Sequence, residues 1–215
     1  MDLLENITVF CHSSIKFNRD KIIYCDPFEI EEEFHDADYI FITHSHYDHY
    51  NPETISKVRK EETIFVAPKD VEEKLKNDLG IDASKIASVI PDQIYDVEGL
   101  RFSTVAAYNR SPFRPFHPKK NGWVGYIITI DSNKYFVAGD TDANEENLMV
   151  ACDVAFIPVG GTYTMDAKEA AIYANVIKPK IAVPIHYGSV VGKKEDGQKF
   201  IDALDKEIEG RLLIK

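Results

Sequence analysis

The sequence predicts a layered α+β fold with two β-sheets inside and helices outside. Short apolar runs typical of strands dominate the first and middle parts of the chain, and helical patterns are few and lie between them. The 215 residues are 44% hydrophobic, which is enough for one sizeable core. No low-complexity stretch, linker or visible repeat divides the chain, so we expect a single domain over residues 1–215.

The first third of the chain alternates strands with polar turns. We expect strands over 7–10, 14–17, 21–25 and 39–43, with an acidic loop or helical turn over 29–38. Asp26 follows the third of these strands and His44 follows the fourth. Strand ends are where functional side chains gather, so both positions are candidates for a site.

Helical signals and further strands follow. Asn51, Pro52 and Glu53 form a helix start, and this helix is expected to run to about residue 59. A second helix is predicted over 68–79 and ends before Gly80. Strands are expected over 63–67, 86–90, 93–97 and 100–108.

The second half begins with a long loop, 109–122, which contains His117 and four basic residues. The later strands are predicted over 123–130, 134–138, 153–159, 181–185 and 211–214. Asp166 and Glu169 form a capping box for a helix that stops before Pro179. A last helix is expected over 197–208.

The charge and cysteine content limit the setting and the partners. The formal net charge of −11 argues against binding to nucleic acid or to an anionic membrane. The three cysteines, Cys11, Cys25 and Cys152, are odd in number and form no C-x-x-C pair, which favours a reduced cytoplasmic protein. No signal peptide and no membrane-spanning run is expected. The sequence leaves the oligomeric state open, a homo-oligomer included.

The densest chemical signal is the string from His44 to His49, which reads His-Ser-His-Tyr-Asp-His. In an extended segment His44 and His46 point the same way, so their imidazoles can hold one ion. Asp48 and His49 lie just beyond and can hold a second ion nearby. Imidazole and carboxylate together suit zinc, iron, nickel or manganese, and the sequence therefore predicts a metal site here.

Polar side chains also follow other buried strands. Asp26, Asp140 and His186 each come directly after such a run, as the histidine string does. We expect strand ends on one edge of the stacked sheets to bring these groups together. Histidines and carboxylates around one or two ions, with an open position for water, make a hydrolytic site.

The histidine string and the Gly-Asp and strand-His features that follow resemble the metallo-β-lactamase superfamily. Three further strings, His12-Ser13-Ser14, Tyr24-Cys25-Asp26-Pro27 and the segment 158–165, are similar to its compact hydrolase branch of ascorbate-6-phosphate lactonase-like and UPF0173-type proteins. The resemblance implies a four-layer αββα sandwich, with two mixed β-sheets packed face to face and helices outside. It also implies a site for one or two divalent ions.

The resemblance assigns roles to individual residues. His44 and His46 match ligands of the first ion, whereas Asp48, His49 and His186 match ligands of the second. The remaining matches are Asp140 as the bridging aspartate, Asp26 as a supporting carboxylate, and His12 and Tyr163 as residues that support the site or face the substrate.

One position departs from the family pattern. A histidine is expected after the strand that ends at Tyr108, and this chain has Asn109 there. Either Asn109 supplies an oxygen ligand or His117 reaches in from the loop, and we favour His117 as the ligand. The same loop is interpreted either as a lid whose basic residues favour anionic substrates or as a solvated basic surface.

These features predict a metal-dependent hydrolase that uses a metal-bound hydroxide on a small-molecule ester, lactone or phosphorylated metabolite. Asp48 and Asp140 are expected to orient the nucleophile and to move its proton. Zinc is the expected ion, with manganese, iron and nickel as alternatives. Two other functions stay open: a phosphodiesterase or nuclease, and a metal- or ligand-binding protein that has lost catalysis.

Overall fold

The computed structural model describes residues 2–214 of the chain. These residues form two compact units, of which the first ends at Ile90 and the second begins at Pro91. Within 2–214, no helix has both the length and the apolar character needed to cross a bilayer.

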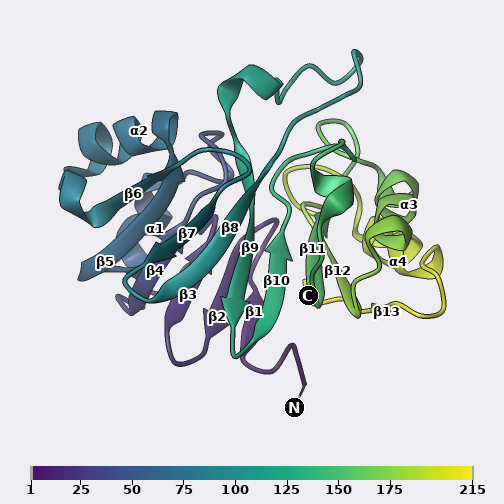
Figure 1. Ribbon diagram of the computed structural model, residues 1–215, viewed down its shortest axis with the longest axis horizontal. Helices are drawn as coiled ribbons and strands as arrows, with labels where there is room; N and C mark the ends of the chain where they lie inside the picture. The colour runs from purple at the N-terminus through teal and green to yellow at the C-terminus, as the bar shows by residue number, and fades with distance from the viewer. Residues whose placement is uncertain (1, 215) are drawn as a thin grey trace. The chain divides into compact units, whose positions relative to one another are not determined.

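Unit 1 is built on a six-stranded sheet with the strand order β1-β2-β3-β4-β5-β6 (Figure 1). Its strands are β1 (Ile7–Val9), β2 (Ile15–Asn18), β3 (Ile22–Cys25), β4 (Ala37–Phe41), β5 (Arg59–Pro68) and β6 (Ile86–Val89). The first three strands pair antiparallel, whereas β3, β4, β5 and β6 pair parallel. Parallel pairing places the carboxyl ends of β3 and β4 on the same edge, so Asp26 and His44 follow neighbouring strand ends.

Two helices accompany the parallel part of this sheet, and they follow their predicted starts and stops. They are α1 (Pro52–Val58) and α2 (Lys69–Leu79), and a short 3₁₀ turn, η1, covers Ala83–Lys85. The Asn51 side chain accepts a hydrogen bond from Thr54 N at 2.8 Å, and Gly80 ends α2 in the left-handed conformation. Ile55, Val71 and Leu75 pack into the buried cluster beneath the helices.

Unit 2 contains a seven-stranded sheet with the order β13-β12-β11-β10-β9-β8-β7. Its strands are β7 (Ile94–Val97), β8 (Leu100–Ala106), β9 (Val124–Ile130), β10 (Asn133–Val137), β11 (Val154–Pro158), β12 (Ile181–Ile185) and β13 (Glu209–Gly210). The strands from β7 to β10 are antiparallel, and those from β10 to β13 are parallel. The carboxyl ends of β8, β10, β11 and β12 therefore lie on one edge.

The helices α3 (Ala167–Ile177) and α4 (Lys194–Asp202) lie side by side next to β11 and β12 (Figure 1). Short 3₁₀ turns, η2 (Lys119–Asn121) and η3 (Asn147–Met149), complete the unit. The predicted capping box of α3 is present, since Asp166 accepts from Glu169 N at 2.9 Å and Glu169 accepts from Asp166 N at 3.0 Å. The alanine-rich face of α3 packs into the core with Ile157 and Phe200.

The end of the chain departs from the predicted elements. Helix α4 begins earlier than expected because Asp196 accepts a hydrogen bond from Lys193 N at 2.7 Å and so caps the first turn. The predicted strand over 211–214 is wrong, because β13 pairs with β12 through Glu209 and Gly210 instead. Ile208 is buried and anchors this register, whereas Leu212 is 44% exposed.

Gly197 in α4 provides a test of this packing. A Cβ atom there would lie 2.5 Å from Cζ of the buried Tyr187 ring. Helix propensity alone would make Gly197→Ala stabilising by about 0.5–1 kcal/mol, but overpacking costs about 1–3 kcal/mol. We expect a net loss in unfolding free energy, measured by urea denaturation. The exposed neighbour Gln198→Ala is the control and should change little; a Gly197→Ala variant more stable than the parent would contradict the packing.

Candidate metal centre

A buried carboxylate organises the candidate site in unit 1. Asp26 is 0% exposed and has a positive φ of 44° directly after β3. Its Oδ1 accepts from Thr43 N at 2.8 Å, and its Oδ2 accepts from Thr43 Oγ1 and from His49 Nδ1, both at 2.7 Å. A charged carboxylate only accepts, so the His49 proton lies on Nδ1 and the lone pair lies on Nε2. This is the arrangement that prepares a histidine to bind a metal.

Thr43 fixes the tautomer of His44 in a similar way. The Thr43 hydroxyl donates to Asp26, so its oxygen accepts from His44 Nδ1 at 3.0 Å. The lone pair of His44 is then on Nε2, which lies 3.1 Å from His46 Nδ1. Two nitrogens bound to one tetrahedral zinc ion lie roughly 3.4 Å apart. The two imidazoles are therefore spaced to hold one ion between them.

Asp48 lies close to two other buried histidines of this unit. Its Oδ2 lies 3.0 Å from His12 Nε2 and 3.7 Å from His49 Nε2. The ligand atoms of His12, Asp48 and His49 all lie within 4.8 Å of one another, and all three side chains are buried. His12 has a φ of 55°, a conformation that costs of order 1 kcal/mol outside glycine and that clusters at functional sites.

Unit 2 brings together three more of the predicted site residues. Asp140 follows β10, His186 follows β12, and His117 comes from the long loop. Oδ2 of Asp140 lies 3.2 Å from His117 Nε2 and 3.0 Å from His186 Nε2. One carboxylate oxygen thus faces two imidazole nitrogens, and all three side chains are buried.

The geometry gives different positions to Asn109 and His117. Oδ1 of Asn109 accepts from both the backbone N and Nδ1 of His117, each at 2.9 Å. The Asn109 amide nitrogen donates to Tyr163 O at 2.9 Å, which is consistent with this orientation of the amide. His117 therefore has its proton on Nδ1 and presents Nε2 to Asp140, while Asn109 stands behind the ring and orients it.

Close backbone packing positions His186. The residue follows the fully buried strand β12 and has a φ of 58°. A Cβ atom on Gly160 would lie 2.2 Å from the carbonyl oxygen of His186, so glycine is required at that position. The Gly160-Gly161 pair after β11 thus allows His186 its place at the strand end.

The donor set fits a divalent ion. Neutral imidazoles with fixed tautomers and buried carboxylates are ligands for zinc and for other first-row metals. Sequence reasoning missed two residues that support the set, Thr43 and Asp142. Asp142 is buried and its Oδ2 accepts from the backbone N of Arg110 and Ser111 at 2.9 and 3.1 Å, which fixes the start of the loop. Its place two residues after Asp140 was the only local signal.

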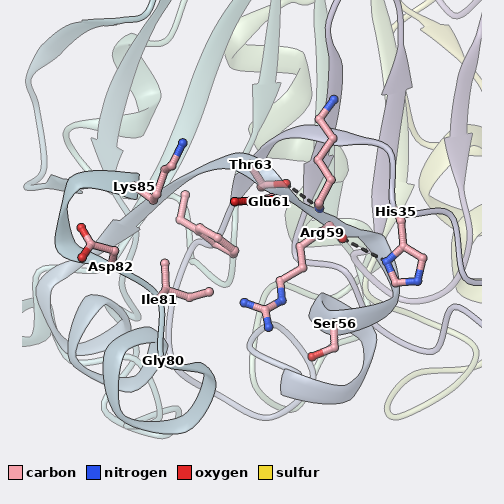
Figure 2. Close-up of a pocket in the computed structure, with 11 residues that line it drawn as sticks. His35, Ser56, Arg59, Glu61, Thr63, Gly80, Ile81, Asp82 and Lys85 are labelled. Atoms are coloured by element: carbon pink, nitrogen blue, oxygen red, sulfur yellow. Dashed lines mark hydrogen bonds between the residues drawn. The ribbon is translucent and has the colours of Figure 1, made fainter.

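A separate cavity of about 680 Å³ lies in unit 1, lined by residues of α1, β5 and the end of α2. Figure 2 shows the Arg59 side chain extending beside Ile81, with His35 at the other side. His35 is exposed, and its Nδ1 lies 3.1 Å from Arg59 O. The residues around this cavity include no predicted metal ligand, so it is not part of the candidate centre.

Comparisons with known proteins show the family to which the chain belongs. Residues 17–187 match the family described as the Beta-lactamase superfamily domain. A UPF0173 metal-dependent hydrolase of Staphylococcus aureus is 28% identical over 203 residues, which cover 87% of this chain and 87% of that protein. A solved structure of a candidate metal-dependent hydrolase from Parabacteroides distasonis is 30% identical, with a TM-score of 0.79 over 97% of this chain and 93% of that chain. Igni18, a metallo hydrolase from Ignicoccus hospitalis, is 23% identical with a TM-score of 0.76 over 97% and 94% of the two chains, a likeness of fold.

The chain therefore belongs to the metallo-β-lactamase superfamily, as its histidine string predicts. Within that superfamily it falls in the UPF0173-like branch of metal-dependent hydrolases. The predicted fold class and the predicted class of enzyme are thereby confirmed.

The contact between Asn109 and His117 generates a prediction about metal affinity. If His117 is the ligand, as the sequence predicts, His117→Ala removes a nitrogen donor, whereas Asn109→Ala removes only the hydrogen bond that orients it, which typically costs 10–100-fold in affinity. Competitive zinc titration against a chromophoric chelator should rank the parent tightest, then Asn109→Ala, then His117→Ala. Asn121→Ala, in the same loop but exposed, is the control. The opposite order of the two site variants would assign the ligand to Asn109.

Proposed function

We propose that this chain is a hydrolase that cleaves a small-molecule ester, lactone or phosphorylated metabolite with one or two divalent ions, zinc foremost. The observation that carries the proposal is the Asp140 carboxylate, whose Oδ2 lies 3.0–3.2 Å from two histidine nitrogens. Such an oxygen would suit a ligand shared by two ions. Membership of a family of metal-dependent hydrolases supports the same assignment.

The proposed ligands are the residues assigned from the sequence. His44, His46 and His117 are assigned to the first ion, and Asp48, His49 and His186 are assigned to the second, with Asp140 shared. His12, Asp26, Asn109 and Tyr163 are assigned to support of the ligands or to contact with substrate.

A bound divalent ion supplies Lewis acidity, which lowers the pKa of water to roughly 7 and polarises the bond to be cleaved. The protein residues do the rest. Asp48, held by His12, orients the attacking water and accepts its proton, and Asp140 shares that role. Asp26 would stabilise the positive charge that His49 gains on binding an ion through Nε2, because the hydrogen bond between Asp26 and His49 is 2.7 Å long and fully buried.

We also propose a cytoplasmic setting for this hydrolase. The thiols of Cys25 and Cys152 are free, which is consistent with a reducing compartment. Burial raises the pKa of the Cys25 thiol well above its usual range and that of Cys152 to about 12, so neither thiol competes as a nucleophile at neutral pH.

The first test of this function is loss of activity on removing a ligand. We expect His46→Ala to lower kcat/KM at least 100-fold on any active substrate, because it removes one of two nitrogens that face each other at 3.1 Å. His35→Ala is the matched control, since this exposed histidine lines the separate cavity. Chelation followed by zinc addition should remove and restore activity. Turnover that survives in His46→Ala would show that the cluster is not the site.

A substrate panel tests the kind of bond that is cleaved. We expect p-nitrophenyl acetate and small lactones to be hydrolysed faster than bis-p-nitrophenyl phosphate, because the net charge of −11 disfavours an anionic phosphodiester over a neutral ester. Release of p-nitrophenol and lactone opening at constant pH are the measurements. Faster cleavage of the phosphodiester would instead support the phosphodiesterase alternative.

A further inference from the structure

The basic residues of the loop 109–122 are engaged within unit 2. Arg114 makes a two-pronged ion pair with Glu169, with Nη1–Oε2 and Nη2–Oε1 distances of 2.6 and 2.8 Å. Its Nη1 also donates to Thr164 O at 2.6 Å. Lys119 pairs with Glu146. Two of the four cations in this loop are therefore neutralised by acids of the same unit, which weakens the interpretation of the loop as a clamp for anions.

Aromatic side chains are exposed where that clamp was expected. Phe116 is 40% exposed and Tyr163 is 38% exposed, and their ring centroids lie 4.8 Å apart at an interplanar angle of 86°. An edge-to-face pair of this kind leaves one ring face and one ring edge open to a third aromatic group. Two aromatic rings that contact each other and remain partly exposed offer an apolar surface on which a third aromatic group can pack.

This aromatic pair is joined directly to the candidate metal centre. Phe116 immediately precedes His117 in the chain. Tyr163 O accepts from the same Asn109 amide that holds Nδ1 of His117. Phe116 is thus joined to His117 by one peptide bond. Tyr163 is connected to His117 by two hydrogen bonds through the Asn109 side chain. A substrate group bound on the rings would therefore place the bond to be cleaved near His117.

The loop is also preformed. Asp142 accepts from two backbone N atoms at its start, and Asn109 N donates to His117 O at 2.8 Å. On the opposite side, Thr164 N donates to Gly161 O at 2.9 Å and closes the turn that carries Tyr163. A rigid aromatic surface binds a flat group at a low cost in conformational entropy.

We propose that Phe116 and Tyr163 form a subsite for an aromatic group of the substrate, so that the enzyme selects aryl-bearing esters or lactones over phosphorylated metabolites. This inference rests on the proposed hydrolase function and names its substrate class. Phe113 lies in the same loop and is 91% exposed, but it is not part of the subsite.

The test compares methyl phenylacetate with methyl acetate, with acid release followed at constant pH. The parent should prefer the phenylacetyl ester about tenfold in kcat/KM, which is the effect of about 1.4 kcal/mol from one buried ring contact. Phe116→Ala should lower kcat/KM about tenfold on methyl phenylacetate and less than twofold on methyl acetate. Tyr163→Phe keeps the ring and should keep the preference. Equal kcat/KM for the two esters in the parent, or equal losses on both in Phe116→Ala, would overturn the subsite.

Binding without turnover separates this inference from the function beneath it. Ligand-observed NMR of phenylacetamide, with acetamide as the matched probe, should show binding to the zinc-loaded parent and to Phe113→Ala but not to Phe116→Ala. That pattern would support the subsite even if neither ester were hydrolysed, in which case only the hydrolase function would fail. Phenylacetamide binding that is equal in all three proteins would overturn the subsite even if both esters were hydrolysed.

Discussion

The hydrogen bond between the buried Asp26 carboxylate and His49 Nδ1 fixes the tautomer of a proposed metal ligand of unit 1. A carboxylate with no solvent exposure is costly unless its oxygens are fully paired. Here three donors satisfy it within 2.8 Å: the Thr43 amide, the Thr43 hydroxyl and His49 Nδ1. The same contacts set the tautomers of His49 and, through Thr43, of His44. In the proposed centre, Asp26 binds no metal, but it fixes the tautomers of His44 and His49, which do.

In each unit, parallel strand pairing places candidate site residues at neighbouring strand ends. In unit 1, β3 and β4 end side by side, so Asp26 and the histidine string follow adjacent strands. In unit 2, β10, β11 and β12 end on one edge and place Asp140, the glycine pair and His186 in succession. The positive φ values of Asp26 and His186 show the sharp turn that the chain makes at these edges. Such strained positions persist because the surrounding hydrogen bonds and close packing determine them.

Much of this organisation could be predicted from sequence because its signals are local. The string from His44 to His49, and Asp140 and His186 after buried runs, name side chains that the structure brings close to other candidate ligands within each unit. The start of α3 was equally local, since its capping box spans only Asp166 to Glu169. The closing strand was misplaced because Glu209 and Gly210, which precede the apolar run 211–214, are the residues that pair with β12.

Other features depend on contacts distant in sequence. Whether Asn109 or His117 faces Asp140 depends on the orientation of one amide, and a sequence separation of eight residues leaves that orientation open. The pairing of Arg114 with Glu169 joins residues 55 apart, so the basic loop could not be distinguished from an anion-binding lid by composition. Thr43 was read as the last residue of a strand, and only the structure shows its hydroxyl between Asp26 and His44.

The central claim is that histidine nitrogens of this chain hold a divalent ion. Zinc K-edge X-ray absorption of the zinc-loaded protein tests it directly, because imidazole ligands give a distinct multiple-scattering pattern with Zn–N distances of about 2.0–2.1 Å. The account predicts two to three imidazoles per zinc ion, and a smaller number in a protein that carries His44→Ala. A spectrum of oxygen ligands alone, unchanged by that substitution, would contradict it.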